Sequence, residues 1–437
     1  AGEERPGRPV IELPGKASTP EQRRRVFARK TYRTFEGGSV DAADLLRLLA
    51  GPVSDVASRA VASLSFAEFG EILRYFGQYL SDERLLPKYG YASPGALYAT
   101  QMYFELDGTG DHAPGYYYYH PLNHQLVLIQ AKPDTGTGIR LHFIGKKEAI
   151  QPVYKNNIQE VLEIETGHMV GLFEEILPEY GLGIRDCAPV PATKDLLACA
   201  EEDYYLGTFE LVPSANARPD EAIDLYLQAH PGKVAGLPTG QYLYRDGALE
   251  RLSDELVLKK HVIAINQQTY ESASFGITAV SRAPDEALRY VNLGRKLQRL
   301  QMNGLHLGFM SSGYSSKTGN DLPSARRMDT LLKTWGRQTG PSYFFVGGRV
   351  SEEQILSEGM KEDIVHMKGP AEMIKDDLVN FLPDYMLPNR VMVLDKLPHT
   401  ANGKIDLKAL DKLNVEFVER PHVAPRTKTE ERICEIW

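Results

Sequence analysis

A basic cluster with one hydroxyl group stands near the end of the first expected helix. In the stretch ARKTYRTF (28–35), Arg29, Lys30 and Arg33 bracket Thr31. An arginine guanidinium grips a phosphate through two parallel hydrogen bonds, and a lysine adds positive charge. The cluster is therefore a candidate phosphate clamp. A solvated basic patch would have the same residues, and the spacing alone favours that simpler interpretation.

A turn rich in proline and glycine leads into an expected strand. The stretch LLPKYGYASPGALYATQMYFEL (85–106) contains Ser93, Pro94 and Gly95 in succession. Glycine adopts backbone conformations that are closed to other residues, so the main chain can approach a flat ligand closely there. Ser93 adds a hydroxyl group beside it. This turn is a candidate ligand-binding turn.

Just before the turn, Lys88 and Tyr89 place an amine beside a phenol. The pKa of a lysine shifts readily on burial, and a tyrosine can pass a proton. The pair is a candidate for proton transfer. One snorkelling lysine next to one core tyrosine would have the same sequence.

A second polar pair, Glu165 and His168, lies three residues apart on one face of an expected helix. We find no further histidine or aspartate spaced as a metal ligand, so we expect no metal site. The favoured interpretation is a satisfied polar pair where two parts of the protein meet.

The elements that must position these groups are amphipathic helices and short strands. Thr19 is suited to cap a helix that begins with Pro20. Apolar residues then recur at helical spacing, or in strand-like runs of aromatic and branched residues. The expected helices include TPEQRRRVFARKTYRTF, DAADLLRLLAG, SFAEFGEILRYFGQYL and NNIQEVLEIETGHMVGLFEEILPEYGLG, and the expected strands include ALYATQMYFEL, GYYYYHP and HQLVLIQA.

The order of these elements occurs twice. A strand, a hairpin, a helix that ends in glycine, and a further helix and strand recur after residue 204, which indicates an internal duplication. The second copy has no arginine-rich opening helix, so we consider it degenerate. The expected organisation is a linker (1–24), a first half (25–204), a second, degenerate half (205–349), a charged helical segment (350–412) and a final linker with the start of a helix (413–437).

Length and composition exclude several classes of protein. A chain of 437 residues predicts two or three domains. A net charge of -8 argues against nucleic-acid binding, and we find no apolar run of the ~20 residues that span a membrane. Cys187, Cys199 and Cys434 form no CxxC pair, and the first residues form no signal core. These features predict a protein of the reducing cytoplasm.

Four stretches together resemble a known family. RKTYRTF, KYGYASPGALYATQMYFEL, PGYYYYHPLNHQL and ETGHMVGLFEEILPEYGLG occur in this order. They resemble the FMN-dependent oxidase domains of the nitroreductase-like superfamily, over about residues 25–349. Relatives include azole-forming dehydrogenases and the oxidase domains of nonribosomal peptide synthetases. IGKKEAIQPVYKNNI and GFMSSGYSSKTGNDLP are most similar to synthetases that make a blue pigment.

The resemblance implies an α+β, nitroreductase-like fold in which two tandem halves form a pseudo-dimer that binds one FMN. By family match, Arg29, Thr31 and Arg33 hold the FMN phosphate, with Lys30 beside them. The turn of Ser93, Pro94 and Gly95 would lie along the flavin ring. The residues expected near the reactive flavin edge are Ser311 and Ser312, and Arg326 or Arg327 is expected to add to the phosphate site.

The resemblance also implies a reaction. Lys88 and Tyr89 match a catalytic pair of azole-forming relatives, so one of them would remove a proton while hydride leaves to the flavin. The substrate would be glutamine, open or cyclised, held as a thioester on the phosphopantetheine arm of a carrier domain, with O2 as the final acceptor. A thiazoline or oxazoline oxidase and a non-catalytic spacer domain remain alternatives, and a plain nitroreductase is a weaker one.

The last part of the sequence resembles two other synthetase domains. LPDYMLPNRVMVLDKLPHTANGKIDLKAL (382–410) is similar to the end of an adenylation domain, and APRTKTEERICEIW is similar to the first helix of a carrier domain. We find no GxxxxGK[ST] loop that would hold ATP. We therefore expect an oxidase inserted into an adenylation domain whose core is a missing partner in cis. Lys404 would serve that core, and we expect no adenylation activity from this sequence alone.

Overall fold

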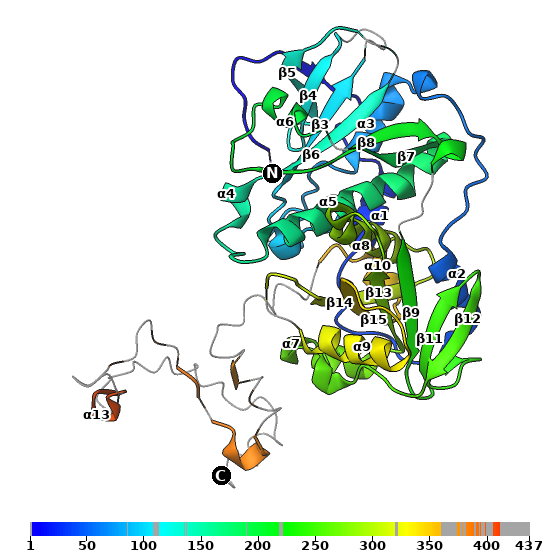
Figure 1. The fold of residues 1–437 in the computed structure, drawn as a ribbon, viewed down its shortest axis with the longest axis vertical. Coiled ribbons are helices and arrows are strands. Elements are labelled where there is room, and N and C mark those ends of the chain that lie inside the picture. Colours follow the sequence, from blue (N-terminus) through cyan, green and yellow to red (C-terminus); the bar gives the residue numbers. More distant parts are fainter. Residues whose placement is uncertain are drawn as a thin grey trace, which may run out of the picture. The chain divides into compact units, whose positions relative to one another are not determined.

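The computed structural model describes residues 2–84, 86–107, 113–134, 136, 138–188, 190–217, 222–319 and 322–359, and short pieces between 374 and 410. The chain divides into two compact units, Ala1–Lys368 and Gly369–Trp437. The first unit contains two large antiparallel sheets with helices between and around them (Figure 1). The described parts of the second unit include η6 (Asp384–Met386) and α13 (Leu407–Leu410). In the part of the chain that the structure describes, we find no helix with the length and apolar character needed to cross a bilayer.

Seven strands form the first sheet, in the order β1-β5-β4-β3-β6-β8-β7, and all neighbours are antiparallel. Side chains alternate between the two faces of a strand. Tyr117 and Tyr119 therefore lie in the main core, while Tyr118 lies on the opposite face. The strands are β1 (Val10–Glu12), β3 (Thr100–Leu106), β4 (Gly115–His120), β5 (Gln125–Ala131), β6 (Ile139–Gly145), β7 (Leu182–Cys187) and β8 (Tyr204–Pro213).

Six strands form the second sheet, in the order β12-β11-β9-β13-β15-β14, again with antiparallel neighbours. Its strands are β9 (Ile223–Ala229), β11 (Gly240–Arg245), β12 (Ala248–Ser253), β13 (Phe275–Ser281), β14 (Leu307–Tyr314) and β15 (Ser342–Arg349). The boundary expected after residue 204 coincides with the start of β8, and β8 belongs to the first sheet.

The smaller elements surround the two sheets. The helices are α1 (Pro20–Ala28), α2 (Ala42–Ala50), α3 (Phe66–Arg74), α4 (Lys147–Ile150), α6 (Thr193–Leu196), α7 (Ala264–Ser272), α9 (Pro323–Thr334) and α10 (Glu352–Leu356). The 3-10 turns are η1 (Val61–Ser63), η2 (Pro94–Ala96), η3 (Leu177–Tyr180), η4 (Ser214–Asn216) and η5 (Lys259–His261), and the two-residue strands are β2 (Val40–Asp41) and β10 (Val234–Ala235).

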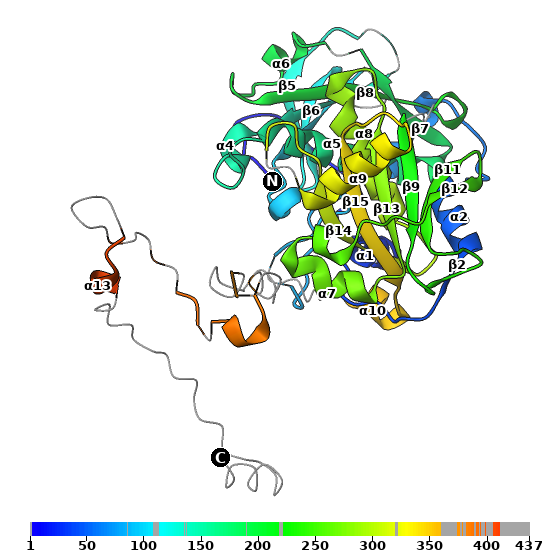
Figure 2. The same ribbon diagram turned by 60° about the horizontal axis from the view of Figure 1, so that its bottom comes forward.

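Two long helices join the halves. Helix α5 (Ile158–Ile176) packs along α8 (Glu286–Gln301), as the views in Figures 1 and 2 show. A Cβ atom on Gly167 would lie 2.0 Å from the carbonyl oxygen of Val291, and one on Gly294 would lie 2.2 Å from the carbonyl oxygen of Ile164. The two backbones are therefore in contact at glycines, and no larger residue fits there.

The chain crosses from one half to the other directly after α1. Thr19 and Gln22 form the capping box that begins this helix, as the sequence predicts. The helix ends at Ala28, earlier than expected, because the chain becomes extended at Arg29 and Thr31 bridges to Phe309 of β14. Strand β2 then pairs with β10, and α2 packs into the core of the second half. This early crossing places the basic cluster at the boundary between the halves.

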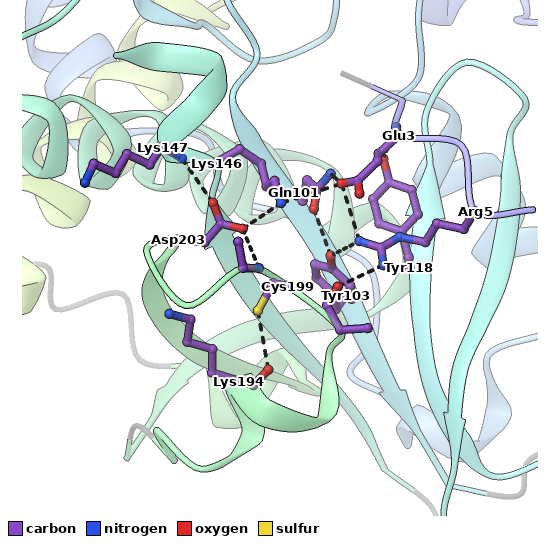
Figure 3. Close-up of polar contacts among 12 residues, drawn as sticks. Glu3, Arg5, Gln101, Tyr103, Tyr118, Lys146, Lys147, Lys194, Cys199 and Asp203 are labelled. Atoms are coloured by element: carbon purple, nitrogen blue, oxygen red, sulfur yellow. Dashed lines mark hydrogen bonds and ion pairs between the residues drawn. The ribbon is translucent and has the colours of Figure 1, made fainter.

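The first residues of the chain lie against the outer face of the first sheet (Figure 3). The Arg5 guanidinium donates to the hydroxyl of Tyr103 at 2.7 Å and lies 5.1 Å from the centre of the Tyr118 ring. The Glu3 amide donates to the Tyr118 hydroxyl at 3.1 Å. The segment expected to be a linker (1–24) therefore includes residues that pack on the first half.

Candidate active site

A chain of hydrogen bonds joins predicted site residues that lie far apart in the sequence. The Arg33 guanidinium donates to the side-chain oxygen of Asn266 on α7, and the Asn266 amide group donates to the carbonyl of Ser311 at 3.1 Å. The hydroxyls of Ser311 and Tyr343 are bonded at 2.6 Å. The Thr269 hydroxyl donates to the carbonyl of Arg33 at 3.0 Å. Helix α7 thus holds Arg33 by its side chain and its main chain, next to β14.

The predicted ligand-binding turn has the backbone that a glycine supplies. Gly95 lies inside η2 with φ +66°, in the left-handed region that favours glycine, and it is exposed. The oxygen of the Ser93 hydroxyl accepts a hydrogen bond from the Tyr98 amide at 2.8 Å. A Cβ on Gly95 would lie 3.6 Å from the hydroxyl of Tyr154. The turn therefore lies next to the Tyr154 phenol, which belongs to the segment after α4.

Tyr154 links this turn to the residues of the second half. Burial raises the pKa of Tyr154, and the Glu165 carboxyl adds to the rise. Burial also raises the pKa of Tyr343, the hydrogen bond from Ser311 opposes that rise, and the Tyr154 phenol adds to it. The Tyr154 phenol thus acts electrostatically on Tyr343, whose hydroxyl is bonded to that of Ser311. The site is thus built from the first half, from the segment after α4 and from β14 and β15.

One buried hydroxyl at this place has no hydrogen-bond partner among the described residues. Ser312 is 1% exposed, and its side-chain oxygen is fully buried. A buried polar atom without a partner costs about 1–3 kcal/mol, and a ligand can supply the partner. Together with the Arg33 guanidinium and the open backbone at Gly95, this donor set fits a flat, hydrogen-bonding and anionic group. The residues present therefore fit FMN.

Arg29 and Lys30 are buried and bonded to main-chain oxygens. Arg29 donates to the carbonyls of Tyr89, Gly90 and Tyr91 at 3.2, 2.9 and 3.0 Å. The Lys30 ammonium donates to carbonyls at the end of α10 and beyond it, including that of Gln354 at 2.7 Å. Burial lowers the pKa of Lys30 to about 8. Both side chains therefore brace the segment that carries Thr31 and Arg33.

The predicted catalytic pair lies directly under this segment. The Lys88 ammonium donates to the Arg29 carbonyl, and the residue is 3% exposed. Tyr89 is 2% exposed and packs against the rings of Tyr91 and Tyr98. Burial raises the pKa of the Tyr89 phenol, and the phenol of Tyr98 adds to the rise. The structure brings this pair close to the basic segment but buries both side chains.

Glu165 and His168, on α5, have different partners. Glu165 accepts hydrogen bonds from the amide and the hydroxyl of Thr100 at 2.8 and 2.6 Å. His168 is bonded to the side-chain oxygen of Gln298 on α8 at 3.1 Å. Burial, with Arg29 nearby, lowers the pKa of His168 to about 3, so the imidazole is neutral. His168 therefore takes part in the contact between the halves, and Glu165 lies beneath the turn before β3.

The remaining predicted residues have other positions. Arg326 is exposed on α9. Arg327 pairs with Glu255 at 2.9 Å and donates to the Leu256 carbonyl at 3.2 Å. Lys404 lies outside the described residues.

Three residues at the site were missed from the sequence. Asn266, Tyr343 and Tyr154 each belong to ordinary helix, strand or loop sequences, and no local spacing sets them apart. The stretch IGKKEAIQPVYKNNI, which carries Tyr154, contributes to the family resemblance. That is the one signal by which Tyr154 could have been found.

A cleft in the first half lies away from this site. It has a volume of about 1040 Å³ and includes Glu105, Arg140, His142, Arg185 and Glu210 in its lining. These residues belong to β3, β6, β7 and β8 of the first sheet. None of the predicted site residues lines this cleft, so it is separate from the candidate active site.

Comparison with known proteins bears on the fold. No protein-family model matches the chain. A solved structure named as a nitroreductase from Anabaena variabilis ATCC 29413 is similar in fold, with a TM-score of 0.50 and 14% identity. The match covers 72% of this chain and 98% of that protein. The chain thus has an α+β, nitroreductase-like fold, which confirms the fold expected from the resemblance.

Similarity in sequence is more specific. The chain is 67% identical over 434 residues to an indigoidine synthase from Streptomyces lavendulae, and 52% identical over 429 residues to one from Dickeya dadantii strain 3937. Both matches cover 98% of this chain but 34% and 29% of the relatives, so the chain spans about a third of their length. A 64-residue stretch is 47% identical to bacitracin synthase 3 from Bacillus licheniformis, covering 15% of this chain and 1% of that protein. Over nearly its whole length the chain is therefore homologous to part of the indigoidine synthases.

Proposed function

We propose that this chain is the FMN-dependent oxidase part of a nonribosomal peptide synthetase and oxidises carrier-tethered glutamine, open or cyclised, on the way to indigoidine. The observation that carries the proposal is the chain of hydrogen bonds from Arg33 through Asn266 to Ser311, together with the left-handed turn at Gly95 beside Tyr154. The nitroreductase-like fold and the 67% identity to an indigoidine synthase support it.

The proposed cofactor site uses residues of both halves. The phosphate of the cofactor would lie beside Thr31 and Arg33. Arg29 and Lys30 brace the segment that carries them. Arg326, exposed on α9, is a further candidate for that side.

The ring of the cofactor would lie along the turn from Ser93 to Gly95. The Ser312 hydroxyl, which is buried without a partner among the described residues, is available to it, and Ser311 lies beside it. Asn266 joins the two sides by its bonds to Arg33 and Ser311.

A bound flavin supplies a hydride acceptor that molecular oxygen can reoxidise. The chain must then position the substrate and remove a proton. A thioester acidifies the α-proton of the attached glutamine, so one well-placed base is sufficient. Lys88 and Tyr89 are the candidates from the resemblance, and the geometry adds Tyr154. Each of these groups would have to give up its own proton before it acts as the base. The Tyr154 hydroxyl lies next to the turn at Gly95, whereas Lys88 and Tyr89 are 3% and 2% exposed.

The proposed partners follow from the homology. The substrate would arrive on the phosphopantetheine arm of a carrier domain, and O2 would be the final acceptor. We assign residues 350–412 to the end of an adenylation domain and 413–437 to the approach to a carrier domain, in agreement with the similarity to several peptide synthetases. Lys404 would act only with the adenylation core.

The test is turnover of defined thioesters under air. The protein, loaded with FMN, is given a glutaminyl thioester and, separately, a thiazoline thioester, and hydrogen peroxide and product mass are measured. The proposal expects peroxide and a product two mass units lighter from the glutaminyl substrate. Turnover of the thiazoline alone would identify an azole-forming oxidase, and turnover of neither would identify a spacer domain. Either result would overturn the proposal.

A further inference from the structure

Glu165 combines complete burial with an incomplete set of hydrogen bonds. It is 1% exposed on α5, and one carboxyl oxygen accepts both bonds from Thr100. The other oxygen is buried and has no hydrogen-bond partner among the described residues. The Ser93 hydroxyl faces the same carboxyl. A buried acid therefore lies against both ends of the turn that carries Gly95.

The surroundings of Glu165 favour its neutral form. Burial is the largest influence and raises its pKa, against the opposing influence of the nearby Ser93 hydroxyl and of the two bonds from Thr100. Among the described residues, the titratable side chains near it include three phenols: Tyr91 and Tyr98 from the segment before β3, and Tyr154 from the segment after α4. A protonated carboxyl is a donor as well as an acceptor. One carboxyl oxygen of Glu165 accepts both bonds from Thr100, so the other oxygen can carry the proton.

We propose that Glu165 is a positioning residue of the cofactor turn, which accepts hydrogen bonds from Thr100 through one carboxyl oxygen and donates one to Ser93 through the other. The Ser93 oxygen already accepts from the Tyr98 amide. With a second bond accepted from Glu165, both lone pairs of this oxygen are used, and its single hydrogen is left to donate to the ligand. Glu165 would thereby set Ser93 as a donor to the flavin. The inference rests on the proposed function for the identity of that ligand.

Three variants on one helix test this role. In Glu165→Gln the amide keeps an acceptor for Thr100 and a donor for Ser93, so the FMN dissociation constant, measured by flavin fluorescence, should stay within about twofold. In Glu165→Ala both bonds are lost, and FMN should bind about tenfold more weakly. Glu175→Gln is the matched control, because Glu175 is also buried on α5 but lies beside Arg299. It should leave FMN affinity unchanged.

Two further readouts separate positioning from general packing. On a Ser93→Ala background, Glu165→Ala should weaken FMN binding no further, because both changes remove one interaction. FMN affinity of the natural protein should fall as the pH rises through the pKa of Glu165, since the anion cannot donate. Glu165→Gln should remove that fall.

Several results would overturn the inference. If Glu165→Gln binds FMN as weakly as Glu165→Ala, the anion is the active form. If Glu165→Ala binds as tightly as the natural protein, the residue has no such role. If the natural protein takes up no FMN, the proposed function fails instead. The bond to Ser93 is then tested by thermal unfolding, where the effects of Glu165→Ala and Ser93→Ala should again be non-additive, and additive effects would refute it.

Discussion

The contact of α5 with α8 should tolerate no side chain at Gly167. In Gly167→Ala the new Cβ would lie 2.0 Å from the carbonyl oxygen of Val291 and 2.8 Å from the Cα of Gly294. Two non-bonded heavy atoms in ordinary van der Waals contact are about 3.4 Å apart or more. The two helices must therefore separate by about 1.4 Å along that line, because the opposing atoms belong to the backbone and cannot rotate away.

This separation acts on stability and on the site together. Overpacking of a core typically costs about 1–3 kcal/mol, and a backbone clash belongs at the upper end of that range. The turn at Gly95 lies in the first half, whereas Ser311 belongs to the second. A shift between the halves should therefore lower the unfolding temperature by several degrees and also weaken FMN binding.

The assay is differential scanning calorimetry combined with the FMN content of the purified protein. Gly304→Ala is the matched control, because its Cβ would meet no atom within 4 Å and its φ is not in the left-handed region. We expect the control to behave as the natural protein. A Gly167→Ala protein with unchanged unfolding temperature and full FMN content would refute the close contact of the two helices.

Three further predictions follow from single residues. Asn266→Ala should weaken FMN binding about tenfold in a fluorescence titration, because Arg33 and Ser311 lose their shared partner; unchanged affinity would remove Asn266 from the site. Tyr154→Phe should lower kcat about 10²–10⁴-fold without loss of FMN if Tyr154 is the base, and Lys88→Met should do so instead if the base is Lys88. His168 has a pKa near 3 in the fold, against 6.5 when unfolded, so the unfolded chain binds a proton that the folded chain does not. The free energy of unfolding of the natural protein should therefore decrease as the pH falls through 6.5, by up to about 1.4 kcal/mol per pH unit from this group. In urea unfolding, His168→Gln should show a shallower decrease. Equal slopes of unfolding free energy against pH in the two proteins would contradict the buried neutral imidazole.

Local patterns predicted the elements better than the contacts between them. The capping box at Thr19 and the alternation of the tyrosines in β4 depend on neighbours in the sequence, and both are present in the structure. The early end of α1 could not be read locally. It depends on a bridge between Thr31 and Phe309, which are brought together only by the fold.

The candidate site shows the same division. The sequence predicted Arg33, Gly95 and Ser311 for it by resemblance, and the structure connects Arg33 to Ser311 by hydrogen bonds. It could not show that Asn266 joins two of them, because an asparagine in a helix carries no signal of its partners. The sequence also could not show that the side chains of Lys88 and Arg29 donate hydrogen bonds to main-chain oxygens of the protein.

The central claim is that two unequal halves hold one flavin between them. Its most direct test is the cofactor content of the purified protein, taken as the visible absorbance per chain and the mass of the molecule released on denaturation. We expect a yellow protein that releases one FMN per chain. A colourless protein that takes up no FMN on incubation, or one that releases two, would contradict it.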